Sequence, residues 1–274
     1  MTVHRARFIV AFIVCVIGVW SSRGNAAPGA IDTTAFSRTV PVKGDVPGLL
    51  QWSNSRPSDS ATVTILSPKE GEQFKPGDSL YVSVAVTGVS LGAQTQYAEI
   101  CGLANSGKGQ HVHVIVDNKP YLADYADGKP FPIGVLDPGV HTVRVFASRS
   151  WHESIKSPGS FKSVTFYVGD SKAPSPILSG KPLLTYSRPK DVYSGDDAKL
   201  ILVDFYLTNA TLSPTGYKVR LTVDGKSSLL TEWVPYLLSG LNPGEHQFKL
   251  ELLNKAGQVV SGVYNVTERT ITTK

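Results

Sequence analysis

The chain has 274 residues, which is enough for two ordinary domains that each bury a core. Its 27 lysines and arginines outnumber the 22 acidic residues, so the formal charge is +5, but three of the arginines lie within residues 1–26 and the rest of the chain carries only +2. That charge is ordinary for a protein surface, and no run of basic residues interleaved with aromatics follows, which argues against a nucleic-acid partner.

Residues 1–26 have the pattern of an export signal. Arg5 and Arg7 precede an apolar run from Phe8 to Trp20, and small residues lead to Ala26. The run has 13 residues, too few to cross a bilayer comfortably. We expect cleavage after Ala26 and export to the periplasm, the cell surface or the medium. The alternative is a retained signal anchor, which would be the expected contact with a membrane.

Residues 27–60 are rich in Ser, Pro, Gly and Thr and show no sustained period, which predicts a flexible N-terminal tether. Beyond the signal a single cysteine remains, Cys101, so the sequence predicts no intramolecular disulfide. A small buried side chain is the plain interpretation of Cys101, and pairing with another chain is the alternative.

Short runs with apolar residues at every second position follow, and Gly, Pro, Asp or Asn bound each of them. This alternation is typical of strands with one buried face. No stretch has a helical stripe. The expected strands of a first domain, residues 61–170, are 61–66, 80–86, 112–116, 141–146 and 163–168.

A proline-containing linker, residues 171–176, precedes a second strand-rich region, residues 177–274. The antiparallel sandwich is favoured over an alternating strand–helix fold because no helices separate the strands. The expected strands of this second domain are 183–186, 198–207, 219–223, 246–252 and 263–271.

The two regions repeat one another. Residues 111–119 (HVHVIVDNK) return as 218–226 (KVRLTVDGK), 107 positions later, and 136–141 (LDPGVH) return as 241–246 (LNPGEH), 105 positions later. That spacing matches the roughly 100 residues of an immunoglobulin-like sandwich. The sequence therefore predicts an all-β protein made of two tandem immunoglobulin-like antiparallel β-sandwiches after a signal peptide.

Two histidines two residues apart are the candidate metal ligands. His111 and His113 share one face of a strand, so both imidazoles can reach one Cu or Zn ion. Alignment of the copies places them opposite Lys218 and Arg220, on the outer face, while the intervening valine faces the core. The simpler interpretation is a solvated or partner-facing pair, and a third ligand would have to come from a neighbouring strand or loop.

His141 shares the parity of the inward residues of its strand, and His246 does the same in the second copy. A Leu-x-Pro-Gly-x-His step at the start of both strands favours a turn closed by a hydrogen-bonded corner histidine over a ligand.

A polar segment with a large aromatic follows the strand at 141–146. Its residues suit binding of a sugar, a peptide or an anion, and the alternative is a loop whose tryptophan packs over the end of the sandwich. The candidate binding residues of this segment are Arg149, Trp151, His152 and Glu153.

The stretch of the first copy from Gly77 to Asp117 is 11 residues longer than the equivalent stretch of the second copy. The excess falls within residues 92–109. Long irregular loops on a rigid scaffold often carry recognition, so Tyr97 and Glu99 are further binding candidates.

Three stretches resemble exported bacterial proteins of uncharacterised function that carry tandem immunoglobulin-like domains. The resemblance spans both copies and implies a bacterial envelope protein, but it brings no catalytic residues. The stretches are residues 110–118 (QHVHVIVDN), 139–154 (GVHTVRVFASRSWHES) and 182–189 (PLLTYSRP).

The leading hypothesis is a non-enzymatic, exported binding or structural module without a cofactor. It would recognise an envelope protein or a glycan through the loops of its first domain. A periplasmic Cu- or Zn-binding protein that uses His111 and His113 is the alternative. A hydrolase ranks third, because the nucleophile elbow, phosphate loop, zinc-protease pair and dinucleotide fingerprint are all missing.

Overall fold

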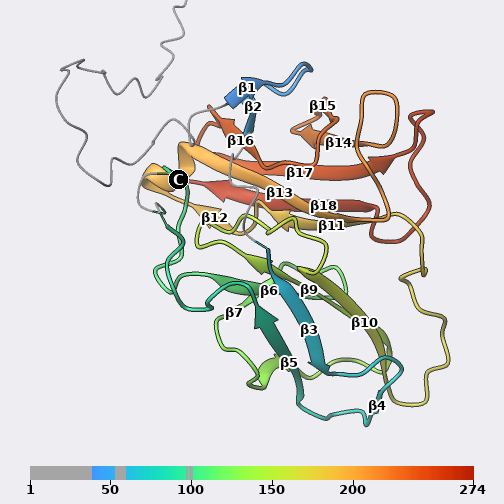
Figure 1. The fold of residues 1–274 in the computed structure, drawn as a ribbon. Coiled ribbons are helices and arrows are strands. Elements are labelled where there is room, and N and C mark those ends of the chain that lie inside the picture. The colour runs from blue at the N-terminus through green and yellow to red at the C-terminus, as the bar shows by residue number, and fades with distance from the viewer. Residues whose placement is uncertain (1–38, 53–59, 97, 99–100) are drawn as a thin grey trace, which may run out of the picture. The chain divides into compact units, whose positions relative to one another are not determined.

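The computed structural model describes residues 39–52, 60–96, 98 and 101–274. These residues form an all-β protein, as the sequence predicts, and its strands can be followed in Figure 1. The predicted signal peptide and the residues Tyr97 and Glu99 lie outside the described part. Within the described part no helix is long and apolar enough to cross a membrane.

The first sandwich consists of two sheets around one core. Its three-stranded sheet has the order β3-β5-β8 and its five-stranded sheet the order β4-β10-β9-β6-β7. Alternate valines of β5 and β6 meet between them. The strands are β3 (Thr62–Ser67), β4 (Gln73–Phe74), β5 (Leu80–Thr87), β6 (His111–Val116), β7 (Leu122–Asp124), β8 (Phe131–Gly134), β9 (Gly139–Ser148) and β10 (Phe161–Val168).

The second sandwich repeats this arrangement. Its sheet β12-β18-β17-β14-β15 has the same order of equivalent strands as the first five-stranded sheet, including a parallel edge strand. The strands are β11 (Leu183–Arg188), β12 (Val192–Tyr193), β13 (Leu200–Thr208), β14 (Lys218–Val223), β15 (Lys226–Leu230), β16 (Tyr236–Ser239), β17 (Gly244–Leu253) and β18 (Val266–Thr273), with a short 3-10 helix at Gly195–Ala198. The duplication read from the sequence is thus a duplication of topology.

The segment predicted as a tether differs from that expectation over its described part. Strands β1 (Thr39–Pro41) and β2 (Leu49–Trp52) extend the other sheet of the second sandwich, in the order β1-β2-β16-β13-β11. Leu49 and Trp52 are 3% and 2% exposed, because Leu49 packs into the core of the second sandwich and Trp52 packs against Trp151. Four residues are too few to show a period, so no strand could be predicted here.

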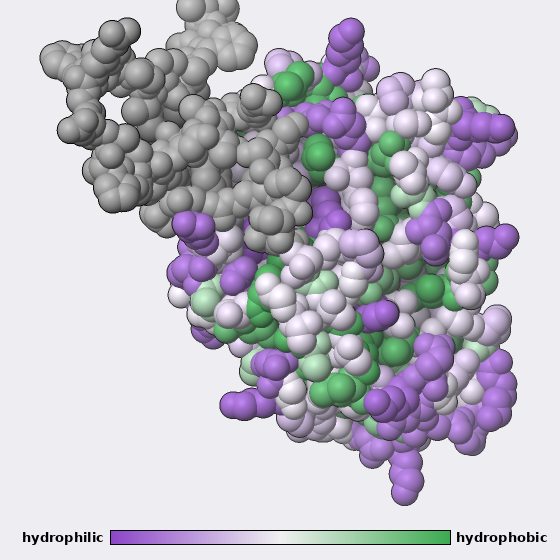
Figure 2. All heavy atoms as spheres, in the orientation of Figure 1, coloured by the Kyte–Doolittle hydropathy of each residue, from purple (hydrophilic) through white to green (hydrophobic). Residues whose placement is uncertain are grey.

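Side chains of the two sandwiches meet through polar and aromatic contacts on the outer face of β6 and β9. Arg144 on β9 donates to Thr185 Oγ1 on β11 at 3.1 Å, and Phe146 stacks with Tyr206 of β13. Every residue of β6 is therefore buried, whereas the equivalent strand β14 alternates between buried and half-buried residues. On the molecular face in Figure 2, hydrophobic side chains lie in small groups among polar ones.

Candidate functional site: a trihistidine cluster

His111 and His113 lie on the face of β6 opposite the valine core, as the register predicts. That pair was expected to be solvated or to face a partner, and the expected exposure is wrong: both histidines are fully buried. The reason is the second sandwich, whose Ser187 on β11 contacts the His113 imidazole, with 3.1 Å between Oγ and Nδ1. The Nε2 atoms of the two histidines lie 3.0 Å apart.

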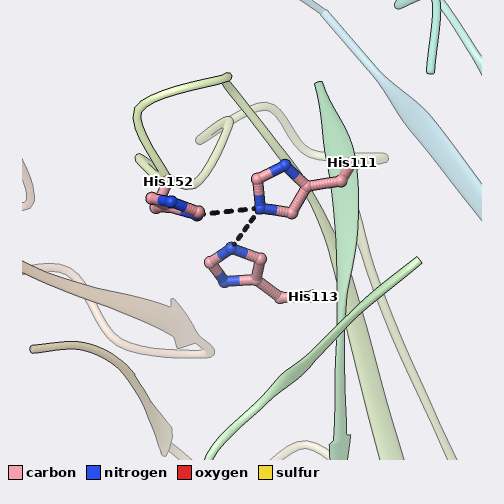
Figure 3. A group of neighbouring side chains, drawn as sticks. All are labelled: His111, His113 and His152. Carbon is pink, nitrogen blue, oxygen red and sulfur yellow. Dashed lines mark hydrogen bonds between the residues drawn. The ribbon is translucent and has the colours of Figure 1, made fainter. Parts of the chain in front are cut away.

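His152 completes a group of three (Figure 3). It comes from the turn after β9, and its Nδ1 lies 3.0 Å from His111 Nε2. The three facing nitrogens all lie within 4.8 Å of one another. Histidine ligands about 2.0–2.1 Å from a tetrahedral ion stand roughly 3.3 Å apart, so small side-chain rotations suffice to hold one ion. His152 thus lies where a metal ion held by His111 and His113 would need a third ligand.

The turn that presents His152 is held by the residues proposed for recognition. Trp151 is fully buried, with its ring 6.2 Å from that of Trp52 and its Nε1 donating to Glu153 Oε2 at 2.8 Å. Arg149 and Glu153 are each 4% exposed and form an ion pair. These three side chains therefore form no exposed binding surface. Trp151 packs against Trp52, Leu202 and Leu237 of the second sandwich, not over the end of its own.

Backbone geometry shows how firmly this turn is set. His152 has φ 69°, in the left-handed region that costs a residue with a side chain about 1–3 kcal/mol. The amide of Arg149 donates to the Glu153 carbonyl, and the amide of His152 donates to the Arg149 carbonyl. The surrounding packing holds the strained residue in place and aims its imidazole at β6.

The extra loop of the first copy supports the same turn. Thr95 and Ser150 exchange hydrogen bonds between amide and hydroxyl groups, and the Ser106 amide donates to the Ser150 carbonyl. Cys101 is partly buried and packs against the cluster that contains the two tryptophans. Its thiol donates to the Ala98 carbonyl. The described part of the loop thus has a positioning role.

Hydrogen bonds at the remote nitrogens fix two of the imidazoles. His111 Nδ1 lies 2.9 Å from the Gly109 carbonyl oxygen, which can only accept, so this nitrogen carries the proton and Nε2 holds the lone pair. Gly109 has φ 84°, and a Cβ there would meet the Ala93 carbonyl. At His113 the hydroxyl of Ser187, which can donate or accept, lies 3.1 Å from Nδ1. Such outer hydrogen bonds orient metal-binding histidines in proteins.

The electrostatic surroundings keep the cluster neutral. Burial lowers the pKa of His111 to about 4, against the opposing hydrogen bond to Gly109. Burial and the neighbouring His111 and His152 hold the pKa of His113 well below its usual range. Burial and the Arg188 cation likewise lower the pKa of His152. At neutral pH the three imidazoles are therefore uncharged, the form that binds metal ions.

Tyr121, between β6 and β7, contacts two of the histidines. Its ring stacks on that of His113 with centroids 3.5 Å apart and planes inclined by 6°. Its hydroxyl lies 3.1 Å from His152 Nδ1. Burial raises the pKa of this phenol, so without an ion it is protonated. Arg188, the last residue of β11, and Lys190, just after it, lie over the same ring at 5.2 and 4.5 Å from its centroid.

Sequence reasoning missed Tyr121, Ser187, Arg188 and Lys190. Their residue types are common in strands and turns, and three of them belong to the second copy, about 75 residues from His111 and His113 in the chain. Hydrophobic periodicity within one strand cannot predict a contact with a residue so distant in the chain. The alignment of the two copies was itself misleading about burial. Lys218 and Arg220, the counterparts of the two histidines, are only partly buried in the second copy, whereas the histidines are fully buried.

The corner histidines match the sequence interpretation. His141 bonds Asp117 Oδ2 through Nδ1 at 3.0 Å and the Asp137 carbonyl through Nε2 at 2.7 Å. His246 repeats both contacts with Asp224 and the Asn242 carbonyl, at 2.6 and 2.7 Å. Each histidine closes its turn and lies apart from the trihistidine cluster.

Comparison with known proteins finds no matching family model and no matching curated protein. Among solved structures, the fibronectin(III)-like modules of Clostridium thermocellum CbhA are 14% identical over 78% of this chain and 94% of theirs, with a TM-score of 0.27. The tandem V-type regions of VCBP3, a v-region-containing chitin binding protein, are 10% identical over 78% of this chain and 99% of theirs, at 0.23.

The BSP domain of a biofilm associated protein is 15% identical, over 77% of this chain and 29% of that one, with a TM-score of 0.22. Scores this low assign neither a relative nor an activity. The immunoglobulin-like sandwich architecture therefore rests on the strand order of the chain itself.

Proposed function

We propose that this protein is a non-enzymatic, exported β-sandwich module that binds one transition-metal ion through His111, His113 and His152. The observation that carries the proposal is the convergence of three neutral imidazoles, two buried and one half-buried, with two of the nitrogen–nitrogen separations at 3.0 Å. The export signal of residues 1–26 supports a role in the bacterial periplasm or at the cell surface.

Hydrogen bonding alone does not satisfy this cluster. His111 Nε2 has one lone pair, because its Nδ1 proton goes to Gly109, yet nitrogens of both His113 and His152 approach it at 3.0 Å. One lone pair accepts one strong hydrogen bond along its axis. A metal ion removes the conflict, because it accepts a lone pair from each imidazole.

The donor set indicates copper or zinc. Imidazole nitrogens suit both ions, whereas Ca²⁺ and Mg²⁺ prefer oxygen ligands. The chain's single methionine is the first residue, so a thioether site for Cu(I) is not available in the body of the protein.

Elemental analysis tests this proposal. The exported protein, purified without an affinity tag and exposed to Cu(II) or Zn(II), should retain about one ion per chain after dialysis. His111→Ala/His113→Ala should lose the ion, and His152→Ala should lower the affinity at least about tenfold. The matched control is His246→Gln, which removes a histidine from the equivalent sandwich. Stoichiometric metal in His111→Ala/His113→Ala, or none in the wild-type protein, contradicts the proposal.

A second candidate function keeps the recognition role of the first domain. A hollow beside the long loop is lined by polar side chains, among them Ser90, Gln94 and Gln110. Amides and hydroxyls at such a place suit hydrogen bonds to a glycan or to the backbone of an envelope protein.

Crosslinking in the native envelope tests that candidate. A defined partner should be captured, and Gln94→Ala/Gln96→Ala should reduce its capture without changing the melting temperature. Equal capture by the variant would show that the hollow is not the contact surface.

A further inference from the structure

The trihistidine cluster lies in an unusually positive environment. Arg188 is 8% exposed, donates through Nη1 to Tyr193, and has no hydrogen-bond partner at Nε among the described residues. No carboxylate of the described residues pairs with it, and the carboxylate paired with Lys190 belongs to the exposed Asp191. A divalent cation next to these two cations is disfavoured unless a negative charge joins it.

Tyr121 can provide that negative charge. Its hydroxyl lies 3.1 Å from His152 Nδ1, close to the distance that separates two ligands of one ion. Arg188 and Lys190 lie over its ring, 5.2 and 4.5 Å from the centroid, so a negatively charged ligand here faces two positive groups. The tyrosine is 3% exposed, so few water molecules compete for its oxygen.

Metal binding also removes one hydrogen-bond partner of this hydroxyl. An ion at the cluster takes the lone pair of His152 Nδ1, so the buried phenol no longer has that nitrogen to bond. The loss of a hydrogen bond by a buried hydroxyl is costly. Coordination of the same oxygen to the ion satisfies it again, and the packing on His113 already holds the ring at the site.

We infer that Tyr121 is the fourth ligand of the metal centre and that the resulting three-imidazole, one-phenolate set selects Cu(II). This inference rests on the proposed function. The metal–oxygen bond forms as the phenol O–H bond breaks and its proton passes to solvent, with no change in oxidation state. A mixed nitrogen and oxygen set is typical of Cu(II), which is also the divalent ion of highest intrinsic affinity in its series.

Visible spectroscopy of the Cu(II)-loaded full chain tests the inference. A phenolate bound to Cu(II) gives a ligand-to-metal charge-transfer band in the visible range, which imidazole ligands alone do not give. Tyr121→Phe should retain about one copper per chain, lose the band and weaken Cu(II) binding about tenfold or more. Tyr125→Phe is the matched control, because this ring also lies beside His111 while its hydroxyl bonds Ser106. It should keep the band.

The outcomes separate the two proposals. Absence of bound copper in the wild-type protein contradicts the metal site itself. Copper bound without the band, a band that survives Tyr121→Phe, or a band that arises only when a small anion such as azide is added overturns the role of Tyr121. If Tyr121→Phe does not fold, resonance Raman spectra of the wild-type copper protein decide, because tyrosinate ring modes must then be enhanced within the band.

Discussion

At the scale of single residues, the corner histidines His141 and His246 show that residues repeated in both copies have a structural role. Both partners of His246, a carboxylate and a carbonyl, accept hydrogen bonds, so the ring donates from both nitrogens when protonated. Burial opposes that charge, but the hydrogen bonds to Asp224 and Asn242 and the Asp224 charge outweigh it and raise the pKa of His246.

The raised pKa predicts a pH dependence of stability. Because the folded-state pKa exceeds the unfolded value of about 6.5, the stabilisation is complete below that pH and is lost as pH rises through the folded pKa. Asp224→Asn keeps the left-handed turn residue, at φ 48°, and should lower the free energy of unfolding by about 1 kcal/mol at pH 6. Its effect should fade towards pH 9.

Urea unfolding at several pH values measures this. Asp196→Asn is the control, because Asp196 pairs with the exposed Lys199 and lies away from any histidine. Equal losses for Asp224→Asn at pH 6 and pH 9 would show that the charge of His246 does not contribute.

At the scale of elements, β6 shows how far the sequence could be interpreted. Alternation of Val112, Val114 and Val116 was enough to find the strand, its core face and the face that carries the histidines. Burial of the second face depends on β11, which follows about 70 residues later, and no period in β6 encodes it. That face has the polar composition of a solvated face. The sequence could therefore predict which residues lie on it, but not that they are buried.

The turn after β9 makes a second element-scale prediction. Trp151→Ala removes a fully buried ring and should cost about 3–5 kcal/mol of stability. It should also release the strained His152 and weaken metal binding. Trp233→Ala is the matched control: that tryptophan packs on Tyr206 and donates to the Phe205 carbonyl, away from the turn. It should lower stability without changing metal affinity.

Calorimetry for stability and competition with a metal indicator for affinity distinguish the two variants. Trp151→Ala protein that binds metal as tightly as the wild type would contradict a positioning role for the turn.

At the scale of the whole molecule, polar side chains from both sandwiches meet and bond in a buried cluster. Asp204 on β13 is fully buried and accepts from Lys156 at 2.6 Å and from the amide and hydroxyl of Ser154. Burial raises the pKa of this carboxyl against the opposing charge of Lys156. Lys156 and Ser154 belong to the first sandwich, so the two copies are joined by a desolvated ion pair.

This ion pair predicts that the two sandwiches unfold together. Lys156→Met leaves the Asp204 carboxylate buried without its cation, which should cost about 3–5 kcal/mol. Because the loss falls on the contact between the copies, calorimetry should resolve the single wild-type transition into two. Lys156→Met/Asp204→Leu, which removes both charges, should recover most of the loss.

Lys199→Met breaks an exposed pair and should leave the transition unchanged. One transition at an unaltered temperature in Lys156→Met would show that the ion pair does not couple the copies. Since the histidines of the first sandwich face Ser187, Arg188 and Lys190 of the second, separation of the two transitions should be accompanied by weaker copper binding. A metal ion would then stabilise the pair of sandwiches as well as occupy the first.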